Sequence, residues 1–140
     1  MKTLSPAITD AERAVNAYKH ELLVRVMAVI VRAALVKIYV SANDVPEDVV
    51  APEHRQGVAS NAWNALNALE IIARVPMSLN VDDLKIYGGR TMNRNENAKG
   101  RWVAVYRLTS RALALTWLER NGLAQAAQRE EVFQMELMGN

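Results

Sequence analysis

Apolar residues recur at every third or fourth position between residues 9 and 36, which predicts one long amphipathic helix. The capping box Thr9-Asp10-Ala11-Glu12 marks its start, because the threonine hydroxyl and the glutamate carboxylate can each accept from a free backbone N–H group. A helix of this length exceeds the usual length of a globular helix, so a break near Lys19-His20 is an open alternative.

The stretch from Leu22 to Leu35 is apolar on almost every side and is interrupted by Arg25 and Arg32. It is too short for a membrane span, which needs roughly 20 apolar residues. We therefore expect a core helix with two exposed arginines or, alternatively, a helix that is shared with a second subunit.

The middle of the chain predicts a short strand and two more helices. The β-rich triplet at residues 38–40 favours the strand. Asn43 is a suitable N-cap for a short helix that ends near Val50, and the clearest helix runs from Val58 to Ile71. One side of this third helix is polar, with Ser60, Asn61, Asn64 and Asn67.

Two segments that alternate between apolar and polar residues predict the strands of a β-hairpin. They are Leu84–Tyr87 and Arg101–Arg107, and they flank a polar segment, 88–100, that glycines bracket. The pattern indicates a hairpin with a long tip. We expect the three tryptophans to anchor the core: Trp63, Trp102 and Trp117.

A last amphipathic helix is predicted after the hairpin. Thr109 or Ser110 is its N-cap, and Asn121-Gly122 is a typical C-terminal signal. A further helical piece is expected from Gln125 to the end of the chain.

The composition limits the class of protein. With 140 residues, 51% of them hydrophobic, the chain can form one domain with a core. The absence of cysteine excludes disulfides, thiolate metal sites and a cysteine nucleophile. No secretory signal is recognisable, so we expect a cytoplasmic protein.

Charge is unevenly distributed along the chain. The formal net charge is only +2, yet the hairpin region from Lys85 to Arg107 has six basic residues against one acid, Glu96. Such a region attracts phosphate groups. The alternative is that the tip is only a solvated loop.

No catalytic constellation is recognisable. The two histidines, His20 and His54, have no partner at metal-ligand spacing, and Ser60 has no evident base. We therefore expect no enzyme, no metal and no cofactor.

The order of predicted elements resembles the winged helix-turn-helix family, in particular small bacteriophage and bacterial regulators. Three segments carry the resemblance: 40–46, leading into the second helix; 61–72, the third helix; and 85–106, the wing. The resemblance implies a mainly α fold with a small β-hairpin wing and flanking amino- and carboxy-terminal helices. The expected parts are a flexible arm (1–8), the winged-helix domain (9–122) and a carboxy-terminal helical extension (123–140). The segment 76–83 is longer than a minimal winged helix needs.

The resemblance implies duplex-DNA binding in a bacterial or phage-infected cell, by a transcriptional regulator or a mobile-element accessory factor. The third helix would read bases in the major groove, where asparagine pairs with adenine and arginine with guanine. The expected base-reading residues are Arg55, Gln56, Ser60, Asn61 and Asn64. The expected backbone contacts from the wing are Lys85, Arg90, Arg94, Lys99 and Arg101.

Two questions stay open at this point. The same fold also serves as a protein-interaction module, so the polar helix face and the hairpin could instead bind a host or replication protein. The flanking helices suggest a homodimer, since they are more apolar than a small domain requires, but they could also pack on each other within one chain.

Overall fold

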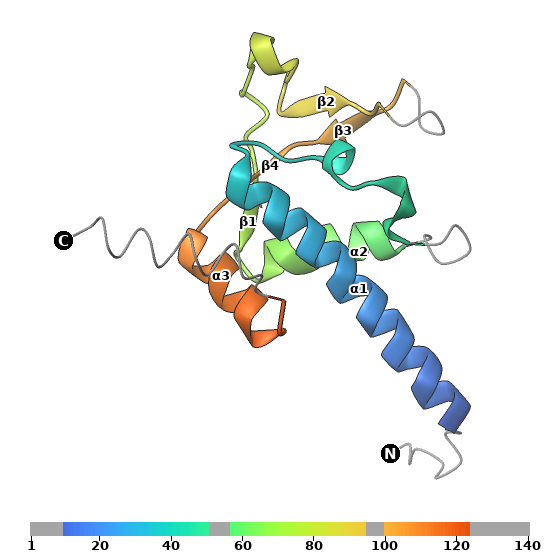
Figure 1. Cartoon of the computed structure of the whole chain (residues 1–140). Helices are drawn as coiled ribbons and strands as arrows, with labels where there is room; N and C mark the ends of the chain where they lie inside the picture. The colour runs from blue at the N-terminus through green and yellow to red at the C-terminus, as the bar shows by residue number, and fades with distance from the viewer. Residues whose placement is uncertain (1–9, 51–56, 95–99, 124–140) are drawn as a thin grey trace, which may run out of the picture.

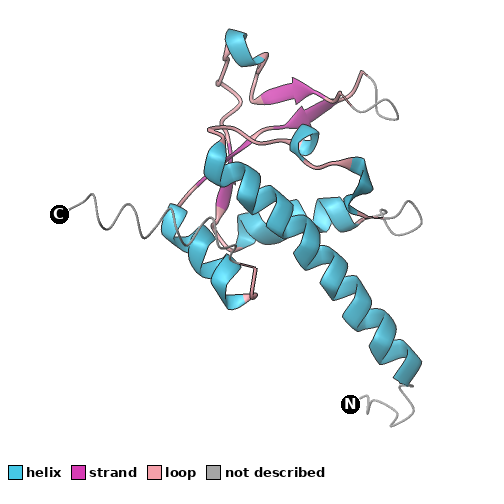
Figure 2. Ribbon diagram, viewed as in Figure 1, coloured by secondary structure: helices cyan, strands magenta, loops and turns pink. Residues whose placement is uncertain are grey.

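The structure, a computed structural model, describes residues 10–50, 57–94 and 100–123. It is a helix-rich mixed fold with two small antiparallel sheets (Figures 1 and 2). Its α-helices are α1 (Asp10–Val36), α2 (Val58–Ala68) and α3 (Arg111–Arg120). Its strands are β1 (Ile72–Arg74), β2 (Arg90–Met92), β3 (Trp102–Ala104) and β4 (Tyr106–Leu108). The 3-10 helices are η1 (Ala42–Asp44), η2 (Glu47–Val49) and η4 (Asp82–Leu84).

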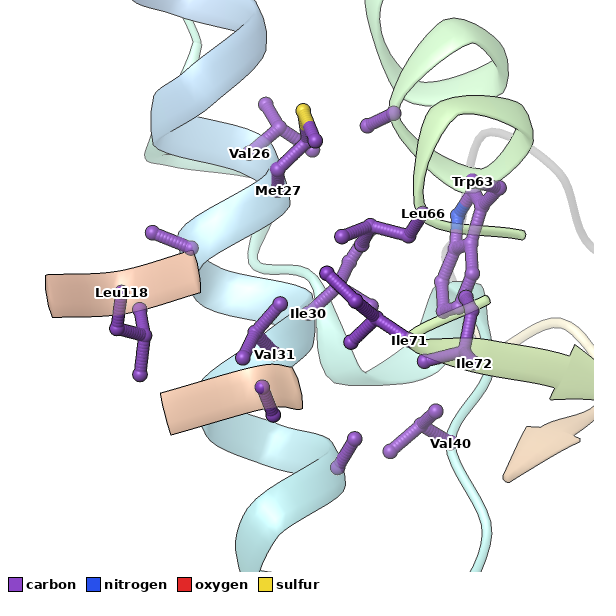
Figure 3. Close-up of a cluster of buried hydrophobic side chains, with 14 of the residues drawn as sticks. Val26, Met27, Ile30, Val31, Val40, Trp63, Leu66, Ile71, Ile72 and Leu118 are labelled. Carbon is purple, nitrogen blue, oxygen red and sulfur yellow. The ribbon is translucent and has the colours of Figure 1, made fainter. Parts of the chain in front are cut away.

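Helix α1 is continuous, without a break near Lys19-His20. Its carboxy-terminal part forms the centre of the core, where Val26, Ile30 and Val31 are buried. Figure 3 shows these side chains with Leu66 of α2 on one side and Leu118 of α3 on the other. The nearly all-round apolar character of this part of α1 is therefore explained in part by packing within one chain. The amino-terminal part of α1 extends away from α2 and α3 (Figure 1).

The expectation of two exposed arginines on α1 is correct for Arg25 and wrong for Arg32. The guanidinium of Arg32 is half-buried and donates a 2.8 Å hydrogen bond to the carbonyl oxygen of Leu123. This bond attaches the residues that follow α3 to the carboxy-terminal part of α1.

The helix expected from Asn43 to Val50 is wrong, because the chain forms the 3-10 helices η1 and η2 there. Ser41, and not Asn43, is the N-cap of η1. Pro46 explains the division, since a proline disfavours the α conformation in the preceding residue, and Val45 is extended.

The strand expected at residues 38–40 is reduced to one bridge between Val40 and Tyr106. Tyr106 belongs to β4, which also pairs with β1 in the register Ile72↔Leu108. Strand β4 thus lies between Val40 and β1. Helix α2 ends at Ala68, three residues earlier than expected, because Glu70 adopts a positive φ of 60° and the chain turns into β1.

The hairpin is present, but its first strand is not the one expected. Residues Asp82–Leu84 form η4, and the backbone of Lys85 adopts the left-handed conformation. The first strand of the hairpin is instead β2, which pairs with β3. The glycine pair 88–89 therefore precedes the hairpin and does not belong to its tip. Val105 separates β3 from β4, so the strand expected at Arg101–Arg107 is divided between two sheets.

The helix expected after the hairpin is confirmed as α3. The Ser110 hydroxyl accepts from the N–H group of Leu113, and Asn121 is the C-cap. The expected arm at 1–8 and the helical piece from Gln125 onward lie outside the described residues. Within the described residues, no helix is long and apolar enough to cross a bilayer.

Candidate nucleic-acid interface

The polar face of α2 is exposed to solvent. Ser60, Asn61 and Asn64 are exposed, whereas Ala62, Trp63 and Leu66 on the opposite side are buried. Of the residues expected to read bases, the structure therefore brings Ser60, Asn61 and Asn64 together on one helix face. Arg55 and Gln56 lie outside the described residues.

The three side chains are available for an outside partner. In the part of the chain that the structure describes, no side-chain hydrogen bond engages Ser60, Asn61 or Asn64. An asparagine amide that is not used internally can offer a donor and an acceptor to the edge of a base. The polar face of α2 thus has the chemistry for base readout.

One face of the hairpin is turned to solvent and combines cationic, aromatic and thioether side chains. Met92 and Trp102 are directly opposite each other in the register, and Arg90 lies two residues before Met92 on the same face. All three are exposed, Trp102 to 47%. The expectation that Trp102 anchors the core is wrong, while Trp63 is buried and Trp117 is half-buried.

An aromatic contact extends this outer face toward η4. The rings of Tyr87 and Trp102 meet edge to face with their centroids 6.5 Å apart. The Tyr87 hydroxyl donates a 2.8 Å hydrogen bond to the carboxylate of Asp82, and this bond raises the pKa of the tyrosine. The count of charges in the hairpin region, residues 85–107, does not include Asp82, although the fold places this carboxylate beside the hairpin.

The expected wing cations are spread along the hairpin and do not form one cluster. Arg94 and Arg101 flank the loop, since the N–H group of Asn93 donates to the carbonyl oxygen of Arg101. Lys85 is at the opposite end, where its carbonyl oxygen accepts from the Thr91 hydroxyl. Lys99 lies outside the described residues. The loop end is thus the more cationic end, since Asp82 lies near the other.

These cations are not neutralised within the described residues. The ion pair that the structure forms there joins Lys37 to Asp44 and involves none of the four arginine and lysine side chains of the hairpin. Lys85, Arg90, Arg94 and Arg101 are all exposed. Within the described residues, their charges are therefore available to an anionic partner.

Asn43 fixes the hairpin to the segment between α1 and α2. Its side-chain N–H donates to the carbonyl oxygen of Met92 at 2.9 Å, and its side-chain oxygen accepts from the N–H group of Arg94 at 2.7 Å. Sequence analysis assigned Asn43 to a helix cap and missed this role. No local signal reveals it, because the partners are 49 and 51 residues away.

The amino end of α2 and the loop end of the hairpin lie on the same side of the molecule (Figure 1). Val58 and Ala59 of α2 and Asn93 and Arg94 of the hairpin line one cavity. The first turn of α2 and Arg94 of the loop end thus share one cavity, whereas Ser60 and Asn61 do not line it.

Two further observations complete the description of the site. Among the described residues, no group of three or more histidine, aspartate or glutamate side chains is placed to hold a metal ion. Comparisons of the chain with models of protein families, with curated proteins and with solved structures give no match.

Proposed function

We propose that the protein binds duplex DNA as a winged-helix protein. The observation that carries the proposal is that an exposed asparagine-rich helix face occurs together with exposed hairpin cations that have no ion pair with a described residue. One element offers base-edge hydrogen bonding and the other offers charge. Proteins that read a DNA sequence combine these two kinds of contact.

The order of elements supports the proposal. Helix α1, the Val40 bridge, the short helices η1 and η2, helix α2 and the paired strands follow one another as in the family that the sequence resembles. Two features depart from that pattern. Two 3-10 helices replace one second helix, and the wing has its own hairpin, β2–β3, beyond the β1–β4 pair.

In this proposal α2 enters the major groove with its amino-terminal half. Asn61 and Asn64 would bond base edges, most favourably adenine, which offers one donor and one acceptor there. Arg94 and Arg101 would contact the adjacent phosphates, since an arginine fork matches the oxygens of a phosphate group. The biological role would be transcriptional regulation or an accessory role in a phage or mobile element.

A protein partner is the second candidate, and the outer face of the hairpin favours it. Tyr87, Met92 and Trp102 form an exposed apolar patch there, and aromatic residues and methionine are enriched where proteins bind proteins. DNA would use the loop end of the hairpin, whereas a protein would use this patch. Binding of a protein would therefore require the Trp102 side chain, whereas binding of DNA would not.

The test is a fluorescence-anisotropy titration of labelled random duplex DNA with the full chain at two salt concentrations. We expect binding that weakens steeply with salt, because each neutralised phosphate releases condensed counterions. The Trp102→Ala variant should leave this affinity nearly unchanged. The absence of binding at the lower salt concentration would refute the proposal.

A further inference from the structure

A cavity of about 390 Å³ lies between α1, the η1–η2 segment, the amino end of α2 and the loop end of the hairpin. DNA binding does not require it. We infer that it binds a small molecule that has an apolar body and one anionic group, such as a medium-chain or aromatic carboxylate.

The walls of the cavity suit an apolar body. Val26, Val50 and Trp63 are buried core residues that line it, and the half-buried Val45, Val49 and Val58 add to the apolar lining. The volume is within the range of small-molecule sites, about 300–1,000 Å³, and such sites are mostly apolar. An apolar ligand would gain free energy by leaving water for these walls.

The polar edge of the cavity determines the charge of the ligand. Arg94 lines it, is exposed, and has no ion pair with a described residue. A guanidinium bonds a carboxylate through two parallel N–H groups, which a neutral head group cannot match. Glu47 also lines the cavity and would favour an ammonium group instead. We assign the anion because only the arginine offers this paired geometry.

Asn43 connects the cavity to the hairpin. It lines the cavity and also holds Met92 and Arg94 through its side-chain hydrogen bonds. A ligand that draws Arg94 inward would move the loop end of the hairpin with it. Control of DNA affinity by the ligand follows from this connection, and that consequence, unlike the site itself, rests on the proposed function.

The experiment is calorimetry of the full chain with three probes that share one apolar body: octanoate, octylamine and 1-octanol. We expect octanoate to bind most tightly. Arg94→Gln should lower the affinity for octanoate by about tenfold and leave the affinity for 1-octanol unchanged. Arg90→Gln is the matched control, because Arg90 is on the same hairpin but does not line the cavity.

A second pair of variants locates the binding. Ala59→Phe fills the cavity from α2 and should lower the affinity for each of the three probes at least about tenfold. Ala68 is exposed at the other end of the same helix and does not line the cavity, so Ala68→Phe should leave the affinity for every probe unchanged. Tighter binding of octylamine, equal effects of the paired variants, or no binding of any probe would overturn the inference. The calorimetry contains no DNA, so a failure of the proposed function would leave its result standing.

Discussion

The indole of Trp63 stacks on the ring of Tyr106 with their centroids 4.7 Å apart and their planes 18° apart. Trp63 belongs to α2, and Tyr106 belongs to β4, where its backbone also pairs with Val40. This one contact joins the helix with the exposed asparagines to the strand between Val40 and β1. Together with the buried Ala62 and Leu66, this contact positions α2 against the rest of the core.

We expect Trp63→Ala to lower the free energy of unfolding by about 3–5 kcal/mol, because it removes a buried aromatic side chain from the core. The control is Trp102→Ala, which removes the same side chain from the exposed face of the hairpin and should cost about 1 kcal/mol or less. Urea unfolding monitored by circular dichroism measures both. Equal losses would contradict the assignment of these two tryptophans.

A second expectation concerns Gly89, which has a φ of 72° and lies against the backbone of Pro76. An added Cβ would be 2.7 Å from the Pro76 carbonyl oxygen. Gly122 has a similar φ of 67°, but a Cβ there would meet nothing within 4 Å. Gly122→Ala should therefore lower the free energy of unfolding by about 1 kcal/mol, through its backbone conformation alone. Gly89→Ala should cost about 1–3 kcal/mol more in the same unfolding experiment.

Local signals in the sequence were sufficient for the helices that end or begin at clear caps. The Ser110 and Asn121 caps of α3 follow from capping chemistry, whereas periodicity predicted α1 and left its continuity open. The position of the first hairpin strand did not follow. The alternation of Leu84 and Ile86 imitates a strand, whereas in the structure Ile86 pairs with Val81 across the short helix η4.

The candidate site was predictable in its residue types but not in its arrangement. The exposure of Ser60, Asn61 and Asn64 follows from the helical period opposite a buried stripe. The hydrogen bonds of Asn43 and the exposure of Trp102 depend on which distant segments pack together. Sequence pattern alone does not determine such long-range contacts.

Base readout by α2 is expected to depend on two asparagines. Once a preferred duplex has been selected from a random pool, Asn61→Ala or Asn64→Ala should cost roughly 1–3 kcal/mol of discrimination at one base pair. Asn67→Ala, on the same face but near the carboxyl end of α2, is the control and should leave the discrimination intact. A uniform loss on random and preferred duplexes would assign these residues to backbone contacts or to folding.

A homodimer through the flanking helices stays a prediction. The amino-terminal part of α1 extends away from α2 and α3 (Figure 1), and the sequence predicts an apolar stripe there through Ala11, Val15 and Tyr18. Sedimentation equilibrium at micromolar concentration should therefore give the mass of two chains. A dimer also predicts an inverted-repeat DNA site with half-sites roughly 34 Å apart. The mass of one chain, unchanged on a tenfold increase in concentration, would leave monomeric binding to a half-site.

The hairpin cations are expected to set the salt dependence of DNA binding. The variant Arg90→Ala/Arg94→Ala/Arg101→Ala removes three exposed charges from the hairpin, and the control Lys19→Ala/Arg25→Ala/Arg120→Ala removes three exposed charges from α1 and α3. Both variants have the same net charge, so a general effect of charge would change them equally. The comparison isolates the position of the cations.

The most direct measurement is the slope of log affinity against log salt for random duplex DNA with the wild type and these two variants. We expect the slope of the hairpin variant to be shallower by about 1 for each cation that touches a phosphate, up to about 3 in total. The control should keep the wild-type slope. Equal slopes for the hairpin variant and the wild type would contradict DNA binding through the hairpin.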